Sequence, residues 1–246
     1  MTFSPWFPYQ SVESAPLRLF CLPPAGGGAS LYRDWPKVFR PDVEVIPVQL
    51  PGREGRLGED PVTSAPELVD RLREPVLARA GERYVLLGHS MGALLAHDLA
   101  AVLTAAGRPP ERLIVSAYRP PHLERPEQDP VEDMSDDDLR AYLAGHAGTP
   151  SEILDQPELM EMVLPVLRAD LLLCQSYRYL PRPPLPVPVS AFGGSTDPAV
   201  TPEKLCAWRE VTTGDFRMRI LPGGHHYLFT SGPAVLEEIR AVVGAS

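Results

Sequence analysis

Short apolar runs alternate along the chain with segments in which apolar residues recur at helical spacing. The runs are aliphatic almost throughout, as expected for strands that are covered on both faces. We predict strands at Leu17–Leu22, Val43–Val48, Tyr84–Gly88, Leu113–Ala117, Val187–Phe192 and Phe216–Leu221. Helical patterns lie between them at about 30–39, 66–80, 91–106, 202–210 and 233–243. This alternation predicts an α/β fold with a mostly parallel, twisted sheet flanked by helices.

One segment interrupts the alternation. Between Ala117 and Val187 the pattern contains no strong strand but two helical stretches, at 135–145 and 157–176. Ser135 is followed by three aspartates, which is typical of a helix N-terminus. We therefore expect a single domain, residues 1–246, with a helical lid inserted at about 120–180, before the strand that precedes the acid described below. The alternative is that the two helices pack on one face of the sheet.

Composition narrows the class of protein. The length of 246 residues and a 44% hydrophobic content support one large domain with a full core. A net charge of −9 argues against nucleic-acid binding. Cys21, Cys174 and Cys206 have no metal-binding spacing, and the first two are expected in the core. With no targeting segment and no apolar run near the ~20 residues of a membrane span, we expect a cytoplasmic protein that does not bind membranes.

The sequence Gly-His-Ser-Met-Gly, residues 88–92, lies between a predicted strand and a predicted helix. Its glycines leave room for a sharp, strained turn that would expose the Ser90 hydroxyl, and the helix N-terminus behind it favours developing negative charge. The pattern predicts that Ser90 is a nucleophile. The alternative is a plain corner between a strand and a helix.

A serine nucleophile needs a base and an acid, which follow it along the chain in this architecture. His225 and His226 lie in a glycine-containing loop after the last predicted strand, and the residues alone do not show which is the base. Asp197 follows the preceding strand, within Gly-Gly-Ser-Thr-Asp-Pro. Asp-Pro is also a common turn sequence, but the strand before that ends in Ser-Ala-Tyr-Arg-Pro-Pro, without a carboxylate. Asp197 is therefore the predicted acid.

The transition state of acyl transfer also needs amide donors for its oxyanion. The N–H of Met91, directly after the nucleophile, is one expected donor. Residues 23–30, Pro-Pro-Ala-Gly-Gly-Gly-Ala-Ser, form what we call the glycine loop, and either Ala25 or Gly26 would supply the second donor. The alternative is a glycine turn without a catalytic role.

From about Leu17 to Val243 the chain resembles type II thioesterases, the stand-alone α/β-hydrolases that accompany polyketide synthases and non-ribosomal peptide synthetases. The stretches that carry the resemblance are PPAGGGAS (23–30), LPGRE (50–54), GHSMG (88–92), SAYRPPH (116–122), LPVLRAD (164–170), FGGSTDP (192–198) and GGHHYL (223–228).

The resemblance implies that Ser90, Asp197 and His225 are the nucleophile, acid and base, which decides between the two histidines. It places the oxyanion donors at Met91 and Ala25. Two positions depart from the family: Pro24 stands where a histidine is usual, and His226 stands where an aromatic residue such as Phe usually follows the base.

The resemblance also implies hydrolysis of acyl thioesters on the phosphopantetheine arm of acyl or peptidyl carrier proteins, which removes stalled or aberrant acyl groups. We expect no metal and no organic cofactor. Residues predicted for the substrate pocket or lid are Pro24, Gly26, Met162, Leu167 and His226, although an apolar stripe on the 157–176 helix would also serve as core. The alternatives are a chain-releasing acyltransferase, a general serine esterase of the same fold, and a catalytically inactive binding protein.

Overall fold

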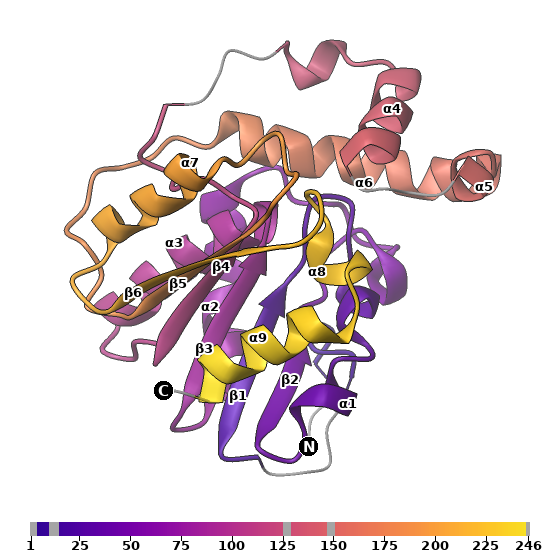
Figure 1. Ribbon diagram of the computed structural model, residues 1–246. Coiled ribbons are helices and arrows are strands. Elements are labelled where there is room, and N and C mark those ends of the chain that lie inside the picture. Colours follow the sequence, from indigo (N-terminus) through magenta and orange to yellow (C-terminus); the bar gives the residue numbers. More distant parts are fainter. Residues whose placement is uncertain (1–3, 10–14, 125–128, 147–150, 245–246) are drawn as a thin grey trace.

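A six-stranded parallel sheet forms the centre of the computed structural model, which describes residues 4–9, 15–124, 129–146 and 151–244 (Figure 1). The strand order is β2-β1-β3-β4-β5-β6, and every neighbouring pair runs parallel. The strands are β1 (Leu17–Leu22), β2 (Val43–Pro47), β3 (Tyr84–His89), β4 (Arg112–Ser116), β5 (Val189–Gly194) and β6 (Phe216–Leu221). The predicted sheet is thus confirmed. β5 begins two residues later than predicted because Pro188, which lacks an N–H, precedes it.

Helices cover both faces of the sheet. They are α1 (Pro36–Phe39), α2 (Ala65–Ala80), α3 (Met91–Ala105), α7 (Pro202–Cys206), α8 (Tyr227–Thr230) and α9 (Pro233–Gly244). The helix predicted at 30–39 is instead a 3₁₀ turn, Ala29–Tyr32, followed by α1, because Pro36 cannot donate to a preceding turn. Similarly, the helix predicted at 202–210 ends at Cys206 and continues as a 3₁₀ turn.

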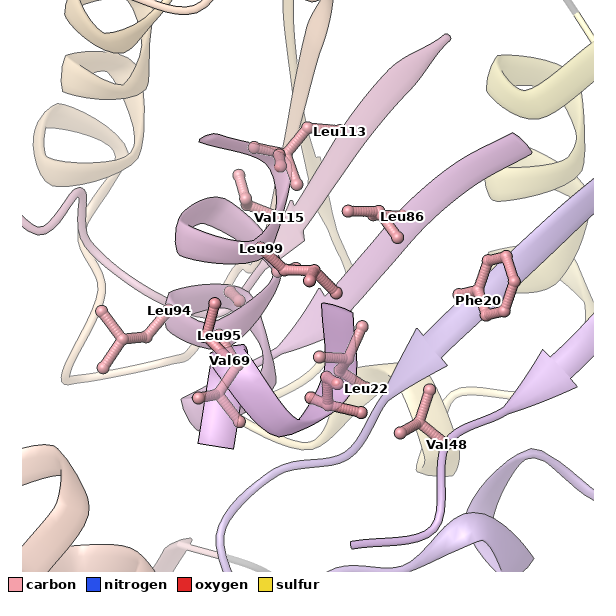
Figure 2. Close-up of a cluster of buried hydrophobic side chains, with 14 of the residues drawn as sticks. Phe20, Leu22, Val48, Val69, Leu86, Leu94, Leu95, Leu99, Leu113 and Val115 are labelled. Carbon is pink, nitrogen blue, oxygen red and sulfur yellow. The ribbon is translucent and has the colours of Figure 1, made fainter. Parts of the chain in front are cut away.

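The alternation of side chains along the strands divides the core into two layers. On β1, Phe20 and Leu22 pack with α2 and α3, whereas Leu19 and Cys21 pack on the other face with α1, α8 and α9. Figure 2 shows the first layer, where side chains of the central strands meet those of α2 and α3. Both faces of the central strands are therefore buried, as their apolar sequences predict.

Among the described residues, three α-helices lie between β4 and β5, in the segment predicted as a lid: α4 (Asp136–His146), α5 (Ser151–Leu154) and α6 (Pro157–Ser176) (Figure 1). Ser135 caps α4 through a reciprocal pair of hydrogen bonds with Asp138, as the sequence indicates. The helices share a small apolar cluster that is separate from the two sheet layers. In contrast, Leu173 and Tyr177, at the end of α6, pack into the main core. The lid is thus anchored to the sheet through the C-terminal part of α6.

None of the helices in the described residues combines the length and the apolar character that a bilayer span requires.

Candidate active site

Ser90 lies at the sharp turn between β3 and α3. Its backbone has φ 53° and ψ −121°, a conformation that L-residues rarely adopt and that stores strain. Side chains at the flanking glycines would collide with backbone: a Cβ at Gly88 would lie 1.9 Å from the carbonyl oxygen of Gly92, and one at Gly92 would lie 2.2 Å from that of Leu22. The Ser90 N–H donates to the carbonyl oxygen of Ser116 at 2.8 Å, which fixes the turn to β4. The turn holds the half-buried Ser90 side chain at the wall of a cavity.

The loops after β5 and β6 bring two further side chains to Ser90. His225 Nε2 lies 2.9 Å from Ser90 Oγ, and His225 Nδ1 lies 2.7 Å from Asp197 Oδ2. The three predicted side chains therefore meet at the carboxyl ends of three parallel strands, although 135 residues separate Ser90 from His225 in sequence. We refer to Ser90, His225 and Asp197 as the triad.

The environment of Asp197 favours its ionised form. Burial raises the pKa of this carboxyl, but the hydrogen bond and charge of His225 and the amides of Ala199 and Val200 lower it by more, so that the pKa lies below its ordinary value. An ionised Asp197 only accepts hydrogen bonds, so Nδ1 of His225 donates to it. Nε2 then carries the lone pair that faces the Ser90 hydroxyl. This arrangement can remove the proton of Ser90.

The two predicted oxyanion donors line the cavity beside Ser90. Ala25 and Met91 both contribute to its wall. In the part of the chain that the structure describes, neither amide donates to a protein acceptor. By contrast, the amide of Gly26 donates to Asp170 Oδ2 at 2.8 Å. Of the two positions that the glycine loop left open, the Gly26 amide is therefore occupied, which leaves the Ala25 amide as the candidate donor.

A buried ion pair ties the glycine loop to the lid. Arg53 forms a bidentate pair with Asp170 of α6, with N···O distances of 2.6 and 2.8 Å, and its guanidinium also donates to the carbonyl oxygen of Gly27. Both side chains are buried, at 7% and 1% exposure. Because Asp170 binds the Gly26 amide as well, this pair fixes the backbone next to Ala25. Arg53 and Asp170 lie in two of the stretches that carry the family resemblance, LPGRE and LPVLRAD. The sequence did not predict that they pair, because 117 positions separate them along the chain.

The cavity has a volume of about 360 Å³. The sheet side contributes Ser90, Met91, Ala117, Tyr118, Arg119 and His225, with Ala25 from the glycine loop; the lid contributes Val131, Tyr142, Leu171, Cys174 and Gln175, and the segment after Asp197 contributes Pro198, Ala199, Val200 and Lys204. Cys174, predicted in the core, is half-buried: it packs against the main core and also lines this wall. Apolar lid residues thus face the triad, with two cationic side chains beside them.

Of the residues predicted for the pocket or lid, Met162 and Leu167 lie on the lid helix α6, but none of the five lines this cavity. Met162 is 44% exposed, because it precedes Leu171 by two and a half helical turns and so lies on the opposite face of α6. Leu167 is fully buried against Gly26. Pro24 is buried within the glycine loop, and His226 packs its ring against His89 and Phe229. None of these residues lines the cavity.

His89 lies behind the triad and is fully buried. Its Nδ1 is 2.9 Å from Ser116 Oγ, which is 2.6 Å from the hydroxyl of Tyr227. Burial, followed by the nearby charges of His225 and His226, holds the pKa of His89 well below its ordinary value. The ring is therefore neutral at physiological pH.

Comparison with known proteins identifies close similarities over the whole chain. A family model described as "Thioesterase domain" matches residues 17–243. The gramicidin S biosynthesis protein GrsT of Aneurinibacillus migulanus is 38% identical over 234 residues, which cover 94% of this chain and 91% of that protein. The type II thioesterase BorB from the borrelidin biosynthetic cluster has a TM-score of 0.89 at 37% identity, covering 99% of both chains. RedJ, a thioesterase of the prodiginine pathway in Streptomyces coelicolor, has a TM-score of 0.85 at 40% identity, covering 98% of this chain and 92% of that chain.

Proposed function

Because this chain belongs to the thioesterase domain family and is an α/β-hydrolase that acts on thioesters, we propose that Ser90, His225 and Asp197 carry the reaction. We further propose that its substrates are stalled or aberrant acyl groups on the phosphopantetheine arm of acyl or peptidyl carrier proteins. Its relatives BorB and GrsT are a type II thioesterase of a borrelidin cluster and a gramicidin S biosynthesis protein, which supports this assignment. The observation that carries the proposed catalytic roles is the placement of His225 within hydrogen-bond distance of both Ser90 and Asp197 at a cavity wall.

Acylation begins when the Ser90 hydroxyl attacks the thioester carbonyl carbon. His225 Nε2 accepts the hydroxyl proton as the new bond forms, and Asp197 stabilises the resulting imidazolium. The carbonyl oxygen becomes an oxyanion that the amides of Ala25 and Met91 bind, and each such donor is typically worth about 3–4 kcal/mol. His225 then gives its proton to the departing sulfur. A thiol, with a pKa near ~8.5, leaves more readily than an amine.

Hydrolysis of the acyl-serine completes the cycle. Water attacks the ester carbonyl while His225 again accepts a proton, and the same two amides bind the second oxyanion. The acid leaves and the Ser90 hydroxyl is restored. Side chains and amides of the chain supply nucleophile, base and oxyanion donors, so we propose that catalysis needs neither a metal nor an organic cofactor.

The walls of the cavity fit the two ends of the proposed substrate. Tyr142, Leu171 and Cys174 offer an apolar surface for an acyl chain on the lid side. Arg119 and Lys204 offer positive charge, which suits the phosphodiester of phosphopantetheine or an acidic carrier protein. Three free cysteines fit the reducing cytoplasm that we propose as its location.

A comparison of three substrates with one acyl group tests the proposal. The group is presented on a carrier protein, on coenzyme A and as a simple ester. We expect the highest kcat/KM for the acyl group on the carrier protein. This substrate alone combines the phosphopantetheine arm with a protein surface that the enzyme can contact. A clear preference for the simple ester would contradict the carrier-protein assignment and favour a general esterase.

Covalent labelling tests the nucleophile separately. A fluorophosphonate should label wild-type protein at Ser90, and Ser90→Ala should lose both the label and nearly all turnover while remaining folded. Ser64→Ala, at the N-cap of α2, is the matched control and should keep both. Labelling that persists in Ser90→Ala would overturn the assignment.

A further inference from the structure

We propose that His89, His225 and His226 form a binding site for Zn²⁺, and that a bound ion reversibly inhibits the enzyme. The inhibition rests on the proposed function, because it requires His225 to be the catalytic base. The metal site itself rests on geometry alone.

The three imidazole rings lie close together. A ring nitrogen from each residue lies within 4.8 Å of the others. The ring centroids are 5.6 Å apart for His89 and His225, 5.3 Å for His89 and His226, and 5.2 Å for His225 and His226. In a tetrahedral site with Zn–N bonds of about 2.0–2.1 Å, ligand nitrogens are about 3.3 Å apart. The rings therefore need to close by about 1.5 Å at most, and His225 and His226 both lie half-buried in a loop.

His89 already has the arrangement of a metal ligand. Its Nε2 is buried and has no hydrogen-bond partner of standard geometry in the described ranges, although the nearby backbone of His225 raises the pKa of the ring slightly against the larger effect of burial. Its Nδ1 is held by Ser116, which is held in turn by Tyr227. In the tautomer with its proton on Nδ1, His89 donates to Ser116 Oγ, and the lone pair lies on Nε2. Histidine ligands of zinc are usually fixed in this way through their other nitrogen.

His226 completes a set of three imidazole ligands. Three imidazoles with a water as the fourth ligand are a common zinc arrangement, and imidazole suits zinc and copper better than calcium or magnesium. The Asp197 carboxylate, 2.7 Å from His225 Nδ1, adds negative charge beside the cation.

A metal on His225 is incompatible with its role in the triad. A neutral imidazole has a single lone pair. In the triad that lone pair is on Nε2, toward Ser90, while Nδ1 donates to Asp197. Coordination through either nitrogen uses the lone pair and breaks one of these hydrogen bonds. The Ser90 proton then has no acceptor, and turnover stops until the ion leaves.

Binding can be measured without activity by using the Ser90→Ala protein. Isothermal titration with ZnCl₂ should show one equivalent bound, and CoCl₂ should give the visible absorption bands of a tetrahedral Co²⁺ site. His226→Phe in the same background should weaken binding at least about tenfold. His122→Phe, at a half-buried histidine outside the cluster, is the matched control and should bind as Ser90→Ala does.

Inhibition is then measured with buffered free Zn²⁺ and an acyl-thioester substrate. We expect most activity to be lost when one equivalent of Zn²⁺ is bound, and to return when EDTA is added. In His226→Phe, with activity expressed relative to its own metal-free rate, the half-inhibiting concentration of free Zn²⁺ should be at least about tenfold higher than in the wild type. Cys174→Ser should be inhibited like the wild type, which excludes zinc binding to the cavity thiol. Inhibition unchanged in His226→Phe, or no binding to Ser90→Ala, would overturn the metal site. Binding that persists while the metal-free enzyme has no thioesterase activity would overturn the proposed function instead.

Discussion

The carboxylate of Asp197 accepts hydrogen bonds from His225 Nδ1 at 2.7 Å and from the amide of Ala199 at 2.9 Å. Asp197→Asn keeps the size of the side chain but lets its amide hold His225 in the wrong tautomer, with the proton on Nε2. We expect kcat to fall about 10³–10⁴-fold with little change in the far-ultraviolet circular dichroism spectrum. Steady-state kinetics with an acyl thioester provide the test. A loss below tenfold would show that Asp197 does not orient the base.

The lowered pKa of Asp197 also predicts an acid dependence of stability. A group whose pKa is lower in the folded than in the unfolded state stabilises the fold above its unfolded pKa, near ~3.9, and this contribution is lost as the pH falls through the folded value. The difference in melting temperature between the wild type and Asp197→Asn should therefore be constant near neutrality and narrow below pH ~4. Thermal melts over this range measure it. A difference that widens with acid would contradict the lowered pKa.

At the residue scale, sequence was sufficient where local chemistry is distinctive. Ser90 between two glycines and Asp197 after a strand have few alternatives. His225 and His226 are adjacent in one loop, and nothing in their spacing shows that the ring of His225 turns toward Ser90 while that of His226 packs on His89. Only the resemblance separated them before the structure did.

At the element scale, the contact between α6 and the glycine loop contains one buried ion pair, between Arg53 and Asp170. Asp170→Ala leaves the buried Arg53 guanidinium unpaired and frees the Gly26 amide. We expect the free energy of unfolding to fall by about 3–5 kcal/mol. In the molecules that remain folded, kcat should fall more than KM rises, because the Ala25 amide acts on the transition state. Denaturant titration and steady-state kinetics give the two readouts.

Asp136→Ala is the matched control, because it removes an exposed ion pair between Asp136 of α4 and Arg168, which lies on α6 like Asp170. We expect it to cost less than about 1 kcal/mol. Arg53→Lys should also have a lower free energy of unfolding and a lower kcat than the wild type, since an ammonium cannot make the bidentate pair. Equal effects of Asp170→Ala and Asp136→Ala would contradict a special role for the buried pair.

The elements themselves were predicted well where their periodicity is long. α2, α3 and α6 match the predicted ranges to within a residue, and α2 continues through Pro75. The predictions failed for short helices. α8, Tyr227–Thr230, has too few residues to show a period, and the 30–39 helix breaks at Pro36. Local pattern does not reveal how tertiary contacts end a short helix.

At the scale of the whole molecule, the sheet could be predicted because right-handed crossovers leave few topologies for alternating strands and helices. Its carboxyl edge then collects Ser90, Asp197 and His225. The cavity could not be predicted in the same way. Apolar residues occur on more than one side of α6, so sequence alone did not show that Cys174 faces the triad while Met162 faces solvent.

The lid and the sheet together form the cavity, so the selectivity for acyl-chain length depends on how they are assembled. Leu171 and Cys174 of α6 and Tyr142 of α4 line it opposite the triad. Cys174→Phe places a larger side chain in this space. We expect kcat/KM for long acyl chains to fall at least about tenfold relative to acetyl, because pocket contacts discriminate by roughly 1–3 kcal/mol per methylene.

The matched control for this effect is Cys206→Phe, at an exposed cysteine on α7. It adds the same side chain outside the cavity and should leave the dependence on chain length unchanged. The measurement is kcat/KM for a series of acyl thioesters from acetyl to decanoyl on one carrier. An equal loss at every length in Cys174→Phe would show general damage to the site, and an unchanged series would place the acyl chain elsewhere. A loss that begins at one length and grows beyond it would instead locate Cys174 along the path of the acyl chain from Ser90.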